Sequence, residues 1–188
     1  VHQSNGCGDV CQSVACDVQL CQKKNQQFNW HGDFVFQSEE DAQAHNIPDL
    51  EKYFLSEKVR KYVLSSGTKN FYSKPATDLD IARPLLTTMH KMHRACQDNY
   101  YSLDYIESDG KINPAKTKSK EELAKLPIRR LTPEEAFLLQ GFPAQFVTNA
   151  HNAGVSDGAL YKQAGNAVSV NAIYAVMYYL ISNNAIHE

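Results

Sequence analysis

The chain of 188 residues carries 19 Lys and Arg against 21 Asp and Glu, a formal net charge of -2 at pH 7. Hydrophobic residues make up 43% and charged residues 21%, proportions of ordinary globular proteins that exclude wholesale disorder and fibrous classes. The length fits one compact domain or a small domain with an appended lobe. The charge gives no general attraction for nucleic acid, so binding of that kind would require a local basic patch.

Residues 1–27 are polar, and we expect them to form a poorly ordered lead or linker. Four of the five cysteines lie in this segment: Cys7, Cys11, Cys16 and Cys21. They form no C-x-x-C pair and have no His at zinc-finger spacing, which favours free thiols, and we predict no metal site. No run of about 18 apolar residues and no signal-peptide pattern occurs, so we expect an intracellular protein without a membrane partner.

From residue 28 onward the chain shows the patterns of short elements. The aromatic stretch 28–36 predicts a strand or two around a Gly turn. Ser56 is placed to cap a helix that ends near Gly67, and its apolar side chains share one face: Val59, Tyr62 and Val63.

Three more segments complete the middle of the chain. The stretch 78–89, broken by Pro84, suits short irregular strands at a sheet edge, and 98–106 is again strand-like. Residues 107–120 predict an exposed loop. Between Arg83 and Arg130 ten Lys or Arg stand against six Asp or Glu, which is the local basic patch of this chain, although charge counts alone favour a solvated surface loop.

The last third has the clearest helix signals. Thr132, Pro133 and Glu135 form a capping box with proline in the first turn, and Gly141 with Pro143 closes the helix. The tail from Ser169 to Ser182 has apolar residues at helical spacing, which predicts an amphipathic helix that requires a partner surface.

Two segments of this last third also resemble a known family. Residues 129–143 read Arg-Arg-Leu-Thr-Pro-Glu-Glu, then Gln-Gly-Phe-Pro, and resemble the ninth conserved motif of DNA (cytosine-5) methyltransferases. Residues 161–170, Tyr-Lys-Gln-Ala-Gly-Asn-Ala-Val-Ser-Val, resemble the tenth motif. Upstream, residues 80–95 and 53–58 are similar to segments of the target-recognition region of some members.

The resemblance implies an α+β chain in two parts after the lead. Residues 28–126 would be a small, irregular, β-rich target-recognition domain. Residues 127–188 would be C-terminal helices that complete a Rossmann-like α/β methyltransferase domain.

The resemblance also implies roles for particular residues. Gly165, Asn166 and Ala167 would lie against the methyl donor S-adenosylmethionine, which the missing catalytic half would bind in the main. The motif residues Arg129, Thr132, Glu135, Gln140 and Gly141 would be structural, with Arg129 and Glu135 forming a buried pair. The basic run would contact double-stranded DNA through Arg83, Thr87, Thr88, His90, Lys91, His93 and Arg94. Taken without the resemblance, Gly-Asn is an ordinary turn and the basic run a solvated one.

The family's catalytic elements have no counterpart in this sequence. No cysteine follows a proline, and Gly6-Cys7-Gly8 lacks a preceding apolar strand, so we predict no catalytic residues here. We expect the target-recognition and C-terminal portion of a cytoplasmic restriction-modification methyltransferase that methylates C5 of cytosine. The catalytic N-terminal half, or alpha subunit, would be its partner. The alternatives are a stand-alone DNA-binding module and, less favoured, a small enzyme that uses the cysteine cluster.

Overall fold

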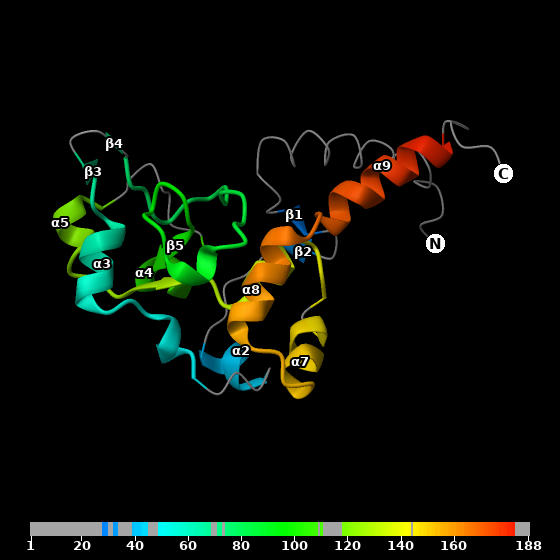
Figure 1. Ribbon diagram of the computed structural model, residues 1–188, viewed down its shortest axis with the longest axis horizontal. Helices are drawn as coiled ribbons and strands as arrows, with labels where there is room; N and C mark the ends of the chain where they lie inside the picture. The colour runs from blue at the N-terminus through cyan, green and yellow to red at the C-terminus, as the bar shows by residue number, and fades with distance from the viewer. Residues whose placement is uncertain are drawn as a thin grey trace.

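The computed structural model describes residues 28–29, 32–33, 39–44, 49–68, 71–72, 74–108, 110, 118–143 and 145–182. The cysteine-bearing lead and most of the expected loop at 107–120 therefore lie outside the described residues. Figure 1 shows a main body made of short helices and hairpins, from which one long helix extends toward the C-terminus.

The strands of the described residues form three antiparallel pairs. β1 (Phe28–Asn29) pairs with β2 (Gly32–Asp33), and β3 (Gly67–Thr68) pairs with β4 (Phe71–Tyr72). β5 (Tyr100–Ser102) pairs with β6 (Ile128–Arg130), so that Tyr100 faces Arg130. The strand turn expected at 28–36 and the strand at 98–106 are thus present, in shorter form.

Helices make up most of the remaining structure. In the first two thirds of the chain they are short: α2 (Glu39–Ala44), the 3-10 turns η1 (Glu51–Tyr53) and η2 (Met89–Lys91), α3 (Glu57–Val63), α4 (Leu103–Glu107) and α5 (Lys120–Leu123). The last third contains α6 (Pro133–Leu139), α7 (Gln145–Asn152), α8 (Asp157–Asn166) and α9 (Val170–Ser182). This mixture of helices and two-stranded sheets agrees with the expected α+β class.

Helix α6 is the element that the sequence predicts most completely. The Thr132 hydroxyl accepts a hydrogen bond from the Glu135 amide at 3.2 Å, and the Glu135 carboxylate accepts one from the Thr132 amide at 2.8 Å, which closes the capping box. At the other end Gly141 adopts φ +83°, and the Phe142 and Gly141 amides donate to the carbonyls of Phe137 and Leu138. These two bonds are a Schellman motif, supported by the edge-on contact of the Phe137 and Phe142 rings at 5.3 Å.

Three expectations for the middle of the chain are wrong in detail. Residues 78–89 form bends and turns instead of strands, although the Asp78 amide donates a single hydrogen bond to the Tyr100 carbonyl of β5. Ser56 occupies the N-cap of α3, but its side chain makes no capping hydrogen bond. Tyr62 is half exposed and does not join the core, and the Arg94 guanidinium lies 5.4 Å from the centre of its ring.

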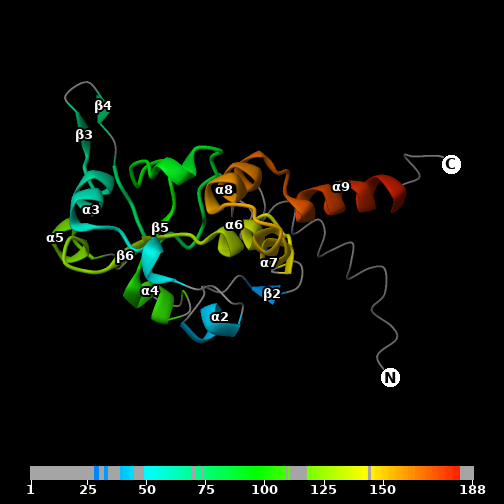
Figure 2. The same ribbon diagram turned by 60° about the horizontal axis from the view of Figure 1, so that its bottom comes forward.

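Buried side chains form three clusters that join distant segments. The largest packs Met89 of η2 against α6 and α8, where Phe137, Leu160 and Tyr161 are almost fully buried. Figure 2 shows the strand and loop region beside α6, α7 and α8. The middle of the chain and the expected C-terminal helices therefore share one core.

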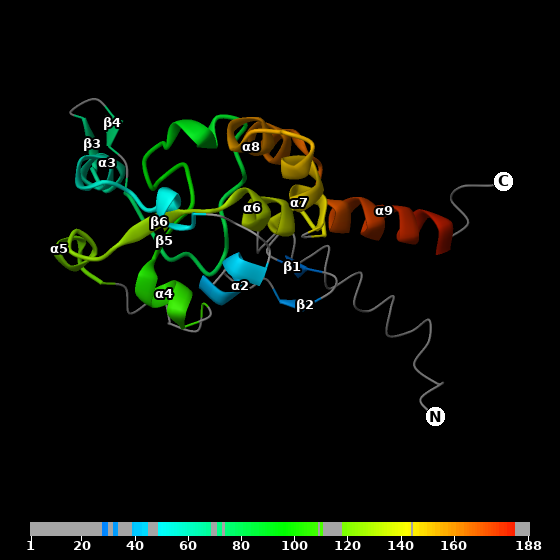
Figure 3. The ribbon, with the colours of Figure 1, turned by 90° about the horizontal axis from the view of Figure 1, so that it is seen from below.

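Helix α9 extends away from this core, as the view from below makes clear (Figure 3). Its apolar side chains are exposed as expected, among them Ile173 at 51%, Val176 at 50% and Ile181 at 60%. By length and composition alone, the helical stretch Asp157–Ile181 could cross a membrane. Core helices of soluble proteins meet the same length and composition but are mostly buried, whereas 22% of the apolar window of this stretch is buried.

Candidate functional site

The loop from Arg83 to Arg94 carries all seven side chains expected to contact DNA, and it runs across one side of α8. A turn at η2 and the left-handed residue Met92, with φ +54°, fold the loop back on itself. The structure thus brings the seven residues together on one short segment.

Four of the seven side chains bond to the protein itself. The Arg83 guanidinium donates to the Ala95 carbonyl at 3.0 Å, and the Arg94 Nε donates to the Ser65 hydroxyl at 3.0 Å. His93 Nε2 lies 2.9 Å from the Thr88 hydroxyl. These contacts hold the loop in shape.

The other three residues are Thr87, His90 and Lys91. Lys91 is exposed and Thr87 is half-buried, and neither side chain bonds to any part of the chain that the structure describes. His90 Nδ1 is buried without a hydrogen-bond partner among the described residues, while the His90 carbonyl lies 3.5 Å from the Arg130 guanidinium. Thr87 and Lys91 are therefore the side chains of this loop best placed to meet an external ligand.

Arg129 and Glu135 form the buried pair that the family resemblance implies. Two parallel hydrogen bonds of 2.7 Å join the guanidinium to the carboxylate, and the side chains are 1% and 0% exposed. Burial alone would lower the pKa of Arg129, but the adjacent Glu135 carboxylate raises it. The pair locks β6 to the first turn of α6.

Gln140 joins three helices at the end of the same motif. Its side-chain amide donates to the Ala164 carbonyl in the last turn of α8 at 2.9 Å, and its own carbonyl accepts from the Val170 amide at the start of α9 at 2.8 Å. Next to it, a Cβ added at Gly141 would stand 2.9 Å from the Asn171 Oδ1 atom. Gln140 and Gly141 thus set where α8 ends and α9 begins.

Gly165 and Asn166 are the last two residues of α8, and Ala167 is its C-cap. Gly165 has no room for a side chain, because an added Cβ would stand 2.6 Å from the Leu86 carbonyl oxygen and closer still to the Thr87 nitrogen. Asn166 is exposed, and Ala167 is half-buried. The residues expected at the methyl donor and the loop expected at DNA are therefore direct neighbours.

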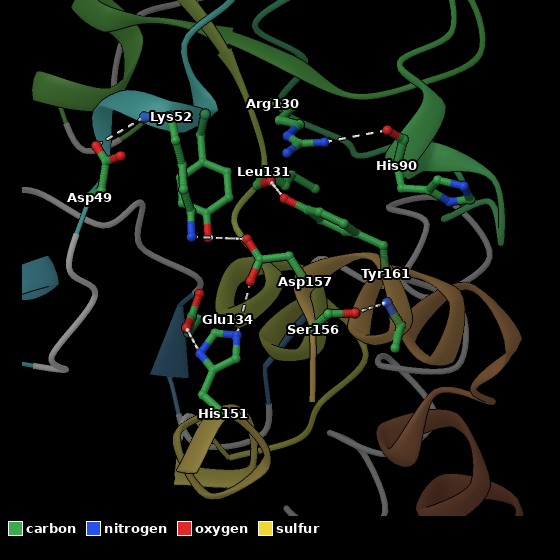
Figure 4. A network of polar contacts seen from close by, with 12 residues as sticks. Asp49, Lys52, His90, Arg130, Leu131, Glu134, His151, Ser156, Asp157 and Tyr161 are labelled. Carbon is green, nitrogen blue, oxygen red and sulfur yellow. Dashed lines mark hydrogen bonds and ion pairs between the residues drawn. The ribbon is translucent and has the colours of Figure 1, made fainter. Parts of the chain in front are cut away.

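A polar network at the other end of α8, around Asp157, was not predicted from the sequence (Figure 4). Asp157 at the start of α8 receives the Tyr53 hydroxyl and the Lys52 ammonium, each at 3.0 Å. His151 lies 3.0 Å from Asp157 and 3.7 Å from the buried Glu134. These contacts tie η1, α6, α7 and α8 together.

The network changes the acidity of its members. Burial opposes ionisation of Asp157, but the hydrogen bonds from Lys52 and Tyr53 outweigh it and lower the Asp157 pKa. Burial raises the pKa of Glu134 and of Tyr53, so the Tyr53 hydroxyl keeps its proton and acts as a donor. Arg130 stacks over the Tyr161 ring at 4.9 Å beside this network. Within the described ranges no group of three His, Cys, Asp or Glu is arranged to hold a metal.

The fold and motifs agree with the comparison to known proteins. The model of the C-5 cytosine-specific DNA methylase family matches residues 18–182. The chain belongs to this family.

Several relatives share part of the chain. The orphan methyltransferase M.SPRI of Bacillus phage SPR is 43% identical over 60 residues, 32% of this chain and 14% of the relative. The type II methyltransferase M.SsoII of Shigella sonnei is 46% identical over 54 residues, 29% of this chain and 13% of the relative. M.HpaII of Haemophilus parainfluenzae is 46% identical over 59 residues, 31% of this chain and 15% of the relative. The matches thus span about one seventh of the relatives' length.

A solved structure shows a similar fold. The Entamoeba histolytica methyltransferase EhMeth superposes with a TM-score of 0.50 and 22% sequence identity, over 71% of this chain and 38% of that protein.

Proposed function

We propose that this chain supplies the target-recognition and C-terminal portion of a DNA (cytosine-5) methyltransferase. The observation that supports it most is the contact between Gly165 and the Leu86–Thr87 backbone. Gly165 belongs to the segment that resembles the tenth motif, and the loop that it contacts carries the polar side chains of Thr87 and Lys91, in a chain that belongs to this family. A role in restriction-modification follows from the type II relatives, and we expect a cytoplasmic protein.

In this proposal the loop 83–94 meets double-stranded DNA. Lys91 is exposed and suits a phosphate, whereas the Thr87 hydroxyl and methyl suit a base edge. Arg83, Thr88, His93 and Arg94 act mainly by shaping the loop, since their side chains already have partners in the protein.

S-adenosylmethionine would supply the methyl group. Residues 165–167, at the end of α8, would lie beside this donor, because the exposed Asn166 carries an amide that can donate and accept hydrogen bonds. Gly165 serves the neighbouring loop instead, since its open face is filled by the Leu86–Thr87 backbone. Asn166 and Ala167 would therefore be the residues that approach the donor.

The chemistry also requires a thiolate that adds to the cytosine ring and a base flipped out of the duplex. This sequence contains no Pro-Cys pair of the kind the family uses. The catalytic half would come from the same longer polypeptide or from a separate chain. The exposed face of α9, with Ile173, Val176 and Tyr179, offers an apolar surface to receive it.

The test is transfer of labelled methyl groups to mixed-sequence duplex DNA. The chain is assayed alone and with the N-terminal half of a family methyltransferase. Methylation in the mixture only is the expected result. Activity in the chain alone would contradict the assignment of catalysis elsewhere, and DNA binding without methylation in either sample would favour a stand-alone DNA-binding module.

A further inference from the structure

We propose that Asp98, Asn99 and Tyr100 are positioning residues that fix the form of the loop 83–93 and so set its DNA sequence preference. The inference rests on the proposed function of that loop. The three side chains are 5%, 7% and 1% exposed, so they act through the loop and do not touch DNA themselves.

The three consecutive residues hold both ends of the loop. At the first end the Asn99 side chain accepts from the Arg83 amide at 2.7 Å and donates to the Arg83 carbonyl at 3.0 Å. At the second end the Asp98 carboxylate accepts from the His93 amide at 2.8 Å, and the Tyr100 hydroxyl donates to the His93 carbonyl at 2.6 Å. Four hydrogen bonds thus fix the two points between which the loop runs.

Between these points the loop also packs on α8, where Met89 is buried in the largest core cluster and the Leu86–Thr87 backbone contacts Gly165. A small hollow lies under it, lined on one side by Pro84, Leu86 and Met89 and on the other by the Asp98–Tyr100 segment and Tyr161. The bonds within the loop are local turns, from the Met89 amide to the Leu86 carbonyl and from the Lys91 amide to the Thr88 carbonyl. Thr87 is therefore held by α8 as well as by the ends of the loop, whereas Lys91 lies two residues from the end that is fixed at His93.

The three residues themselves lie on a rigid base. Tyr100 begins β5 and pairs with Arg130 of β6, next to the buried Arg129–Glu135 pair. The Tyr100 carbonyl also accepts from the Asp78 amide at 3.0 Å. The segment that resembles the ninth motif thus supports, through Arg130 of β6, the three residues that hold the loop.

A preorganised loop gains sequence preference because base contacts need side chains in fixed places, whereas phosphate contacts tolerate movement. Removing the hydrogen bonds from Asp98, Asn99 or Tyr100 to the loop should lower discrimination between DNA sites while leaving general DNA affinity nearly unchanged. A residue that only stabilises the fold would not separate these two quantities.

The test compares Tyr100→Phe with Tyr101→Phe in the full chain, together with Asn99→Ala and Gln97→Ala. Tyr101 is buried to the same 1%, but its hydroxyl points to the Leu79 carbonyl, outside the loop. Gln97 is exposed next to Asp98. One readout is amide hydrogen exchange across residues 83–93, and the other is the preference ratio from selection on a random duplex pool at fixed salt.

We expect Asn99→Ala to speed exchange in the loop and lower the preference ratio, each by about tenfold, with a smaller effect of Tyr100→Phe. Tyr101→Phe and Gln97→Ala should change neither. Unchanged exchange, or faster exchange with unchanged preference, would overturn the inference. If Asn99→Ala speeds loop exchange but the unchanged chain binds no DNA, the proposed function is wrong, and only the structural role of Asp98, Asn99 and Tyr100 remains.

Discussion

Gly165 of α8 lies directly against the backbone of Thr87, with no space for a side chain between them. The contact joins the last helical turn before Asn166 to the loop that carries Thr87 and Lys91. Because both partners are backbone, neither can move aside by changing a side-chain rotamer. A shift of the C-terminal end of α8 must therefore move the loop, and a shift of the loop must move the end of α8.

The first prediction is that Gly165→Ala displaces the loop. The added methyl group would overlap the Leu86 carbonyl, so we expect a loss of about 1–3 kcal/mol in the free energy of unfolding and weaker DNA binding. Gly158→Ala is the matched control, since it lies in the same helix with nothing within 4 Å of the added Cβ. Urea unfolding and DNA titration of both variants check this, and equal behaviour of the two would contradict it.

The second prediction concerns the Arg129–Glu135 pair. Arg129→Met leaves the Glu135 carboxylate buried without its cation, so we expect a loss of about 3–5 kcal/mol in the free energy of unfolding. Lys61→Ala removes an ion pair with Glu57 whose side chains are 72% and 70% exposed, and it should leave stability unchanged. Urea unfolding of the two variants gives the comparison. A loss in Arg129→Met as small as that in Lys61→Ala would show that the pair is dispensable.

The contrast between predicted and missed features follows from distance along the chain. The capping box and Schellman ending of α6 depend on residues within a few positions of one another, so the sequence pattern contains them. The Arg129–Glu135 pair, six residues apart, was expected from the family resemblance and not from a local pattern. The Tyr53–Asp157 bond joins residues 104 positions apart and depends on how η1 packs against α8. Local patterns give no sign of such a contact.

The wrong expectation at 78–89 has a related cause. Composition favoured strands there, but the segment takes its form from side chains elsewhere, such as Asn99, which bonds to both backbone groups of Arg83. Asp78 is likewise held at φ +56°, with its carboxylate accepting from the Ser102 amide at 2.6 Å. Hydrophobic periodicity and composition do not reveal where a distant side chain takes the hydrogen bonds that a partner strand would otherwise supply.

The third prediction is acid destabilisation through Asp157. Its pKa is lowered in the folded chain, so the stability that it contributes is present above its unfolded pKa, about 3.9, and is lost as pH falls through the folded value. Glu134 acts in the opposite sense, because its raised pKa makes protonation favour the folded state. Asp157→Asn should therefore flatten the fall in melting temperature below about pH 4. The exposed Asp80→Asn is the control, and an unaltered acid profile in Asp157→Asn would contradict the role of this carboxylate.

The fourth prediction separates backbone strain from close contact at two glycines. Gly141 and Gly154 have nearly the same φ, +83° and +82°, so alanine is strained at both, by about 1 kcal/mol. A Cβ at Gly154 would meet nothing within 4 Å, whereas one at Gly141 would press on the Asn171 side chain at the start of α9. Gly141→Ala should therefore lose more stability than Gly154→Ala in urea unfolding.

After the effect of Asn171→Ala alone is subtracted, adding Asn171→Ala to Gly141→Ala should recover part of the difference. The single Asn171→Ala variant measures that effect. If the double variant is no more stable than the two single losses predict by addition, the close contact with α9 carries no energy and backbone strain alone accounts for Gly141.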